Sequence, residues 1–444
     1  MAANTRESVL ATIHDEGIEA IWHWFVDLEG SIKGFAITPS EIERSLGEGM
    51  HFDGSSISGF NAIEESDLLA RPDLSTFAIL PGHDGEAKSA RFFCDIQNPD
   101  GTPYERDPRH VLRETVKRAN AMGLESYMGP ELEFFIFNGM HDPTPIDSGG
   151  YFTGPPVDLG HTIRTDIIKE LNQLGIIVEY QHHEVAAGQQ EIDLRYNKVL
   201  NMADDATTYK YVVKNTAQRH GKYATFMPKP VFGVNGSGMH VHQSLFANGK
   251  GNNAFADASD PNGLSATAKH YIAGILKYAQ ELTCFWNPTV NSYKRLVPGY
   301  EAPVYIAWSV TNRSALIRIP AFVKGNEKSV RMELRCPDPS ANPYLAFATM
   351  LGAGLKGIDE QLELEEPQVD NLYELTEMER EKRQIKSLPG NLHEALHHCK
   401  RGSLAREVLG SSMVDNYLAL KYAEYDDYRL QVTQWEMERY YPVL

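Results

Sequence analysis

The chain has 444 residues, a length that predicts two or three domain-sized units rather than one ordinary core. Hydrophobic residues make up 42% of it, as in folded globular proteins and unlike disordered chains. Because 42 Lys and Arg face 60 Asp and Glu, the formal net charge is −18, which argues against nucleic acid or an anionic membrane surface as a partner.

The predicted compartment follows from the N-terminus and the cysteines. The first residues lack the charged-then-apolar pattern of a secretory signal, and no apolar stretch approaches the ~18–20 residues of a membrane span. The four cysteines are scattered, without a C-x-x-C pair, and we expect free thiols in a reducing compartment. A cytoplasmic protein is therefore expected.

The first hundred residues predict a small unit that mixes helices and strands. Thr5 to Ile18 has the spacing of a short helix, and Glu19–Asp27 is rich in the aromatic and β-branched residues of a strand. Thr38-Pro39-Ser40-Glu41 predicts a helix start, with Thr as the N-cap and Pro in the first turn. Further strands are expected around Ser75–Leu80 and Ala90–Ile96.

A larger unit is expected after an interruption at Arg106-Asp107-Pro108-Arg109. A helix follows from about His110 to Met122, and we place the domains at residues 1–104 and 105–444. Tyr373–Lys400 predicts a charged, exposed helical segment. The last ~30 residues predict one more helix with many aromatic side chains.

Four short strands alternate ionisable with apolar residues. This alternation puts the ionisable side chains of each strand on one face. The strands are Glu131-Leu-Glu133-Phe-Phe, Glu191-Ile-Asp193-Leu-Arg195, His240-Val-His242-Gln-Ser244 and Arg331-Met-Glu333-Leu-Arg335. A solvated sheet face would explain any one strand. Such a face mixes in Lys, Thr and Ser freely, whereas these four are dominated by Glu, His and Arg.

The residue types favour phosphoryl-transfer chemistry. Several Glu with one His suit divalent cations that prefer oxygen, such as Mg²⁺ or Mn²⁺. Arginines beside them suit phosphate and carboxylate groups. A metal with an arginine clamp is what phosphoryl transfer needs, because positioning and charge neutralisation do most of its catalysis. No G-x-x-x-x-G-K-[ST] loop occurs, so a P-loop enzyme is not expected.

Two other motifs are interpreted as decoys. The glycines of Gly233-Val-Asn-Gly236-Ser-Gly238 fit the dinucleotide fingerprint poorly, because its third glycine position is Val241. His393-Glu-Ala-Leu-His397 matches the H-E-x-x-H zinc pattern, yet no obvious third ligand follows it. We interpret the second motif as part of an exposed, charged helix.

Seven further motifs in register resemble the glutamine synthetase family over nearly the whole chain. Each is weak alone, and together they are very specific. They are Phe52-Asp53-Gly54-Ser55-Ser56-Ile57, Gly129-Pro130-Glu131-Leu132-Glu133-Phe134, His182-His183-Glu184-Val185-Ala186, Asn235-Gly236-Ser237-Gly238-Met239-His240, Asn291-Ser292-Tyr293-Lys294-Arg295-Leu296, Asn312-Arg313-Ser314-Ala315 and Asn342-Pro343-Tyr344-Leu345. The chain is similar to the short bacterial and archaeal type I form.

The resemblance implies an α+β fold with a β-grasp-like N-terminal domain and a catalytic domain whose curved antiparallel sheet forms a funnel. It also implies dodecamers of two hexameric rings, in which the Asp53 loop of a neighbouring subunit completes each site. Two or more Mg²⁺ or Mn²⁺ ions per site are expected. The implied ligands are Glu133, Glu184 and Glu191 for one ion, and Glu131, His240 and Glu333 for the second.

The resemblance further implies glutamate, ammonium and ATP as substrates. The implied glutamate residues are Asn235, Gly236, Arg295, Arg313 and Arg335. Those facing ATP are His242, Ser244, Arg318 and Arg331. Asp53 is expected to be the base that deprotonates ammonium, with Tyr151 and Glu301 helping to bind it and Glu301 on a flap that excludes water. Arg313 is implied in catalysis as well.

Two alternatives to a glutamate–ammonia ligase differ in what the sequence should show. A γ-glutamyl-amine ligase would use an alkylamine or polyamine instead of ammonia. Such relatives commonly alter the ammonium pocket, whereas this chain keeps all of its residues: Asp53, Ser56, Tyr151 and Glu301. A catalytically inactive binding protein of the same family would lose metal ligands, and this chain keeps them.

Overall fold

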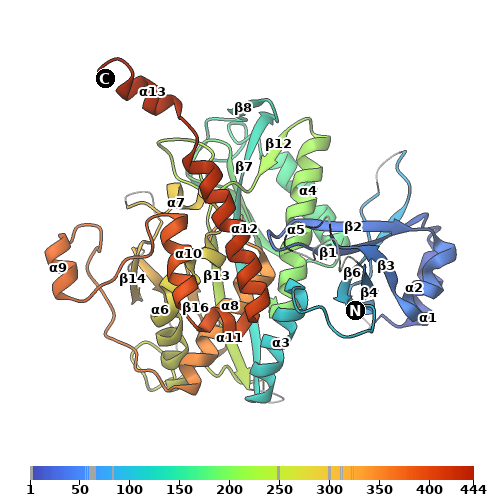
Figure 1. Cartoon of the computed structure of the whole chain (residues 1–444), viewed down its shortest axis with the longest axis horizontal. Coiled ribbons are helices and arrows are strands. Elements are labelled where there is room, and N and C mark those ends of the chain that lie inside the picture. Colours follow the sequence, from blue (N-terminus) through green and yellow to red (C-terminus); the bar gives the residue numbers. More distant parts are fainter. Residues whose placement is uncertain are drawn as a thin grey trace.

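The computed structural model describes residues 4–55, 57, 59, 67–82, 85–247, 251–298, 302–310, 312, 314–321, 323 and 325–444. The N-terminal unit lies to one side of a larger body in Figure 1. Each unit is built on its own sheet. The architecture is α+β, as predicted.

The N-terminal sheet contains six strands within the described residues, in the order β2-β1-β6-β4-β3 with β5 on β6. Its helices α1 and α2 lie at the outer end of this unit in Figure 1. The bounds are α1 (Arg6–Asp15), β1 (Ala20–Val26), β2 (Ile32–Ile37), α2 (Ile42–Glu48), β3 (Met50–Asp53), β4 (Asp67–Pro72), β5 (Ala78–Ile79) and β6 (Ser89–Gln97).

Local chemistry explains two differences from the predicted elements. Thr38 makes no capping bond, because its hydroxyl pairs with that of Ser40 at 2.8 Å; a 3-10 turn over Pro39–Glu41 precedes α2. The strand predicted over Ser75–Leu80 shrinks to β5. Asp73 accepts the backbone N–H of Ser75 at 3.1 Å, which starts a 3-10 turn instead. The helix predicted over Thr5–Ile18 and the strands predicted over Glu19–Asp27 and Ala90–Ile96 are confirmed as α1, β1 and β6.

The second sheet has ten strands within the described residues and runs β14-β15-β16-β13-β7-β10-β9, with β8, β11 and β12 on β7. All of its pairs are antiparallel except β14 with β15. The bounds are β7 (Leu124–Gly139), β8 (Asp142–Pro145), β9 (Val178–His183), β10 (Gln189–Leu194), β11 (Asn197–Lys198), β12 (Tyr223–Thr225), β13 (Met239–Ala247), β14 (Tyr305–Ser309), β15 (Ala315–Arg318) and β16 (Met332–Leu334).

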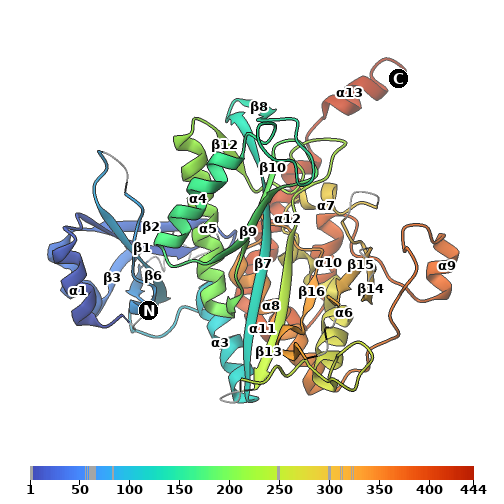
Figure 2. The same cartoon turned by 180° about the vertical axis from the view of Figure 1, so that it is seen from behind.

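Helices cover one face of this sheet, and the opposite face is free to carry a site. In Figure 2 the strands β7 and β13 lie in front of α6, α8, α10 and α12. Leu132, Phe134 and Val241 point into the core beneath these strands. The helices are α3 (Pro108–Ala121), α4 (His161–Gln173), α5 (Val199–Arg219), α6 (Ala266–Trp286), α7 (Ser292–Arg295), α8 (Pro343–Asp359), α9 (Glu377–Lys382), α10 (Leu392–Arg401), α11 (Leu404–Leu409), α12 (Ser411–Arg429) and α13 (Gln434–Tyr440).

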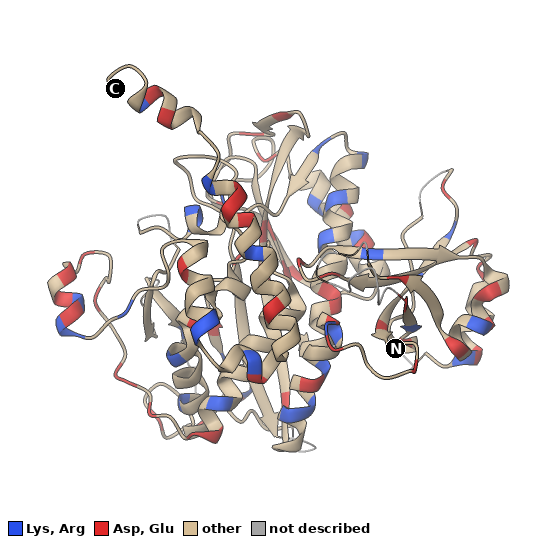
Figure 3. Ribbon diagram, in the orientation of Figure 1, with Lys and Arg blue, Asp and Glu red and all other residues tan. Residues whose placement is uncertain are grey.

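The C-terminal part differs from its prediction in two places. Within Tyr373–Lys400, α9 is exposed, but the apolar side of α10 is buried and packs on α6. The single predicted terminal helix is two helices, and α13 extends away from the body in Figure 1. No helix in the described part of the chain combines the length and apolar character of a membrane span. Lys, Arg, Asp and Glu are interspersed along the outer helices in Figure 3.

A buried arginine joins the two units. Helix α3 begins at Pro108, two residues before its predicted start, because Asp107 accepts the backbone N–H of Arg109 at 3.0 Å. The Arg109 guanidinium donates to Asp73 (2.8 Å) and Asp95 (2.5 Å) in the N-terminal unit. It also donates to both carboxylate oxygens of Asp204 on α5, at 3.0 and 2.9 Å. This fork fixes the N-terminal sheet against α5.

Candidate active site

Sheet register gathers the predicted carboxylates at the centre of the free face. Strand β7 lies between β10 and β13, and Glu191 of β10 is directly opposite Glu133 of β7. Asp193 and His240 both face Glu131 across the two ladders. Directly opposite residues in a ladder point to the same side of the sheet, so these groups share one face.

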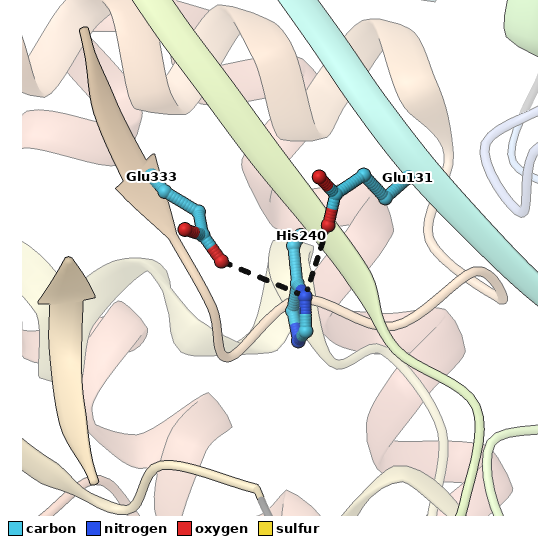
Figure 4. Close-up of side chains that lie close together, drawn as sticks. All are labelled: Glu131, His240 and Glu333. Atoms are coloured by element: carbon cyan, nitrogen blue, oxygen red, sulfur yellow. Dashed lines mark hydrogen bonds and ion pairs between the residues drawn. The ribbon is translucent and has the colours of Figure 1, made fainter. Parts of the chain in front are cut away.

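Glu131, His240 and Glu333 form a first cluster, drawn in Figure 4. They come from β7, β13 and β16, and one ligand atom of each lies within 4.8 Å of the others. His240 Nδ1 is 3.3 Å from Glu131 Oε2 and 3.7 Å from Glu333 Oε1. Burial acts to raise the pKa of Glu131, but hydrogen bonds with His240 and His242 outweigh it and hold that pKa well below its ordinary value. Glu131 is thus a stable anion.

His182, Glu184 and Glu191 form a second cluster by the same criterion. His182 Nε2 is 2.9 Å from Glu184 Oε1 and 4.0 Å from Glu191 Oε2. The sequence predicted Glu133 as the third member. Glu133 lies beside the cluster, where its Oε2 accepts from Gln189 Nε2 (2.7 Å) and from the Gly238 backbone N–H (3.0 Å). Its role as a ligand stays a prediction.

The donor set fits hard divalent cations. The pKa of Glu133 is raised well above its usual range, mainly by burial and secondly by the nearby negative charge of Glu184. Burial, followed by the charges of Asp193 and Glu133, does the same for Glu191. Crowded, desolvated carboxylates repel one another, and a bound cation relieves this repulsion. Oxygen donors with a single imidazole per cluster suit Mg²⁺ or Mn²⁺.

A cavity of about 430 Å³ contains both clusters and three arginines. Arg318 Nε and Arg335 Nε donate to the two oxygens of Glu333, at 2.6 and 3.1 Å. Arg295 donates to the backbone carbonyls of Cys336 (2.7 Å) and Pro337 (3.2 Å). These bonds hold the guanidinium groups at the cavity wall, where they can bind a carboxylate or a phosphate.

A second cavity of about 360 Å³ adjoins the first and shares Glu131 and Tyr180 with it. His242, Ser244 and Arg331 line it, and Arg331 Nε lies 3.1 Å from His242 Nδ1. Arg318, which the sequence grouped with these residues, lines the first cavity instead. Most of its other lining residues were not predicted from the sequence, among them Glu179, Tyr196 and Lys328.

Asn235 and Gly236 line the first cavity on a closely packed turn. The Pro228 carbonyl accepts the Ser237 N–H at 2.8 Å, and a Cβ atom at Gly236 would lie 2.2 Å from that same carbonyl oxygen. Only glycine fits this position without a backbone shift. The Gly236 carbonyl in turn accepts from Gln189 Nε2 at 3.3 Å.

Of the two predicted ammonium residues that the structure describes, Tyr151 lines the site and Asp53 does not. Tyr151 lines the first cavity and its ring lies edge-on to His182, with 5.4 Å between centroids. Asp53 ends the edge strand β3, is exposed, and lines neither of these two cavities. Its carboxylate accepts the Ser55 N–H at 2.8 Å. The predicted residues Ser56, Glu301 and Arg313 lie outside the described residues.

The H-E-x-x-H motif and the glycine-rich motif do not form a metal or dinucleotide site of their own among the described residues. In the described chain, the groups suited to a metal are the two clusters above, and neither contains His393 or His397. The ring of His393 lies against Tyr422 and Tyr425, with centroids 5.8 and 5.2 Å apart. Gly233 precedes the Asn235 turn and lines neither cavity.

Comparisons with known proteins agree over the full length. A family model of the glutamine synthetase catalytic domain matches residues 105–440, and one of the glutamine synthetase β-grasp domain matches residues 17–99. The glutamine synthetase of Clostridium saccharobutylicum is 49% identical over 444 residues, covering 99% of each chain. That of Methanosarcina mazei is also 49% identical, covering 99% of this chain and 98% of its own.

Solved structures show the same fold. The cryoEM structure of Plasmodium falciparum glutamine synthetase is similar with a TM-score of 0.89 and 27% identity, covering 99% of both chains. A GmaS/ADP complex is similar with a TM-score of 0.89 and 30% identity, covering 98% of this chain and 99% of its own.

Proposed function

The chain belongs to the glutamine synthetase family, and we propose that it joins ammonia to the side chain of glutamate at the expense of ATP. The observation that carries this proposal is the pair of adjoining cavities that meet at Glu131. One offers carboxylate clusters with arginines, and the other offers a groove lined by His242, Ser244 and Arg331. A γ-phosphate from the second can meet a carboxylate in the first.

Divalent cations fit the two clusters. Glu131, His240 and Glu333 would hold one ion; Glu184 and Glu191, with His182 or Glu133, would hold another. Mg²⁺ or Mn²⁺ bound there would neutralise the charge of the transferring phosphoryl group. The protein's own contribution is the fixed geometry of these side chains and their separation from bulk water.

We propose that Arg295, Arg335 and the Asn235-Gly236 turn hold glutamate, with Arg313. The γ-carboxylate oxygen then attacks the terminal phosphorus of ATP, the bond to ADP breaks, and γ-glutamyl phosphate forms. Arg318 faces the transferring group from the Glu333 side, while Arg331, His242 and Ser244 hold the nucleotide. These donors are preorganised by their own hydrogen bonds, so little reorganisation is needed as charge develops.

Amide formation needs ammonia rather than ammonium. We propose that Asp53 removes one proton from ammonium and that Tyr151 and Glu301 bind the cation. The freed ammonia attacks the acyl carbon, the bond from that carbon to the phosphate oxygen breaks, and inorganic phosphate leaves with its electron pair. The added nitrogen then gives its extra proton to the departing phosphate, which leaves the neutral amide. Glu301 would shield the acyl phosphate from hydrolysis.

The position of Asp53 supports a site shared between subunits. It lies on an exposed edge outside both cavities of its own chain. We propose that a second copy supplies this loop, within a dodecamer of two hexameric rings. We also propose a cytoplasmic location and a division into domains 1–104 and 105–444, which the two separate sheets support.

The competing function is that of a γ-glutamyl-amine ligase, and a comparison of amine acceptors distinguishes it from a glutamate–ammonia ligase. ATP turnover with glutamate is measured with ammonium, methylamine, isopropylamine and putrescine as acceptors. We expect ammonium to give the highest kcat/KM. A strong preference for an alkylamine would overturn the proposed acceptor and leave the phosphorylation chemistry intact.

A further inference from the structure

A buried aspartate–histidine pair lies beside residues that line the active site: His183 stands between His182 and Glu184. Asp147 and His183 have side chains that are 1% and 0% exposed, and Asp147 Oδ1 is 2.9 Å from His183 Nε2. Neither residue lines the two site cavities. What they contact is the backbone around two site residues, Tyr151 and Glu184.

Asp147 gathers the loop that carries Tyr151. We call residues 147–160 the Tyr151 loop. The Asp147 carboxylate accepts backbone N–H groups from both arms of this loop, at Gly149 (3.3 Å) and Leu159 (3.1 Å). It also accepts the N–H of Gly188 at 2.9 Å, in the turn that follows Glu184. One carboxylate therefore fixes two separate segments of the site.

His183 connects the same loop to Glu184. Its ring Nδ1 lies 2.6 Å from the Glu184 carbonyl oxygen, and its own carbonyl accepts the Phe152 N–H at 3.0 Å. The packing is close, because a Cβ atom at Gly149 would lie 2.6 Å from His183 Nε2. The two ring nitrogens therefore have different partners: Nε2 contacts the Asp147 carboxylate, and Nδ1 contacts the Glu184 carbonyl oxygen.

We propose that Asp147 and His183 are positioning residues that set the Tyr151 loop and Glu184 in one geometry, so that acceptor pocket and metal site are built together. The roles of Tyr151 and Glu184 rest on the proposed function. A pair that only stabilised the fold would weaken every property of the enzyme alike. A positioning pair predicts effects that separate according to which bond of the His183 ring is removed.

Two substitutions remove one bond each. In His183→Asn the amide nitrogen takes the place of Nδ1, which keeps the Glu184 carbonyl bond and loses Asp147. In His183→Gln the amide nitrogen reaches the place of Nε2, which keeps Asp147 and loses the Glu184 carbonyl. Three readouts on the full-length protein are backbone amide exchange in residues 149–159, Mn²⁺ affinity by electron paramagnetic resonance, and the KM for ammonium.

We expect His183→Asn to speed amide exchange in the loop and to raise the ammonium KM by about 10-fold or more, with Mn²⁺ affinity within about 3-fold. His183→Gln should weaken Mn²⁺ binding by about 10- to 100-fold, as removal of outer-shell partners does, and leave loop exchange within about 3-fold. Asp147→Asn should speed loop exchange as His183→Asn does, because an amide nitrogen in place of Oδ2 cannot accept the Leu159 N–H. Its amide oxygen can still accept from His183, so Mn²⁺ affinity should stay within about 3-fold.

Asp27→Asn is the matched control. Asp27 is equally buried and accepts the N–H groups of Glu29 (3.0 Å) and Ser31 (2.9 Å), outside both site cavities. All three readouts should stay within about 3-fold. Equal effects of the two His183 variants on loop and metal, or no effect of either, would overturn the positioning role. An enzyme indifferent to ammonium would refute the proposed function, while exchange and Mn²⁺ binding would still decide the role of the pair.

Discussion

The Gly236 turn gives the sharpest test of the proposed glutamate site. In Gly236→Ala the added Cβ would lie 2.2 Å from the Pro228 carbonyl oxygen, whereas real Cβ contacts essentially never fall below 3.0 Å. The backbone must therefore shift by at least about 0.8 Å. The opposing atom is itself backbone, held by the Ser237 N–H at 2.8 Å, so it cannot yield as a flexible side chain would.

The shift reaches both substrate and carboxylates. Gln189 Nε2 bonds the Gly236 carbonyl and also Glu133, so a displaced turn disturbs the second cluster as well. A misplacement of about 1 Å can cost about 100-fold in rate, or about 2.7 kcal/mol of transition-state stabilisation. We expect kcat/KM for glutamate to fall by about 100-fold, with the KM for ATP changing by less than about 3-fold.

The assay is the initial rate of ADP formation with glutamate varied at saturating ATP, ammonium and Mg²⁺. Gly139→Ala is the control, because an added Cβ at that end of β7 meets nothing within 4 Å. It should alter kcat/KM by less than about 2-fold. A folded Gly236→Ala enzyme with kcat/KM for glutamate within about 3-fold of the parent would refute the assignment of this turn.

Three further predictions follow from the structure. Asp53→Ala should spare glutamate-dependent ADP formation more than amide formation. The control is Asp67→Ala, at the exposed residue opposite Asp53 in the β3–β4 ladder, and it should spare both activities. Equal loss of both activities in Asp53→Ala would reject the assignment of Asp53 as the base. Arg109→Met should lower the free energy of unfolding by about 3–5 kcal/mol in urea titrations, because the buried Asp204 carboxylate loses the guanidinium that bonds both of its oxygens. Arg118→Met, which loses a partly exposed pair with Glu407, should cost at most about 1 kcal/mol. Burial acts to raise the pKa of Asp73, but the charge of Arg109 outweighs it and lowers that pKa from 3.8 to about 2. The stability that this pair contributes is therefore present above about pH 4 and is lost as the pH falls towards 2. Asp73→Asn should flatten that part of an acid-unfolding curve, and an unchanged curve would contradict the link.

The faces of the central strands could be predicted from the sequence, because side chains alternate strictly along a strand. Glu131 and Glu133 share a face for that reason alone. That Glu191 lies opposite Glu133 could not be predicted, since register depends on long-range pairing that a two-residue period does not specify. Only the family resemblance placed Glu133 and Glu191 together, and the pairing of β7 with β10 is the physical reason that they are close.

His182 shows a signal that was present and was interpreted too narrowly. The predicted ligands include Glu184 from the motif His182-His183-Glu184-Val185-Ala186, but not His182. In the structure His182 belongs to the same alternation as Tyr180 and Glu184, at the end of an edge strand, and it joins a cluster. Extending the two-residue period back from Glu184 would have identified it. Arg109 carried no comparable signal, because its three carboxylates are far away in the sequence.

The strand register that builds the site also places carboxylates close together, where they repel one another. Glu191 faces Glu133 directly, and like charges opposite each other in a ladder destabilise it. A slip of one residue between the two strands would separate them, but it would also turn the apolar side chains of one strand, Leu132 or Ile192, out of the core. Burial of the apolar face therefore imposes the repulsion on the other face. The carboxylates are held together by the hydrophobic core beneath them, and cation binding is the way this arrangement gains free energy without changing the fold.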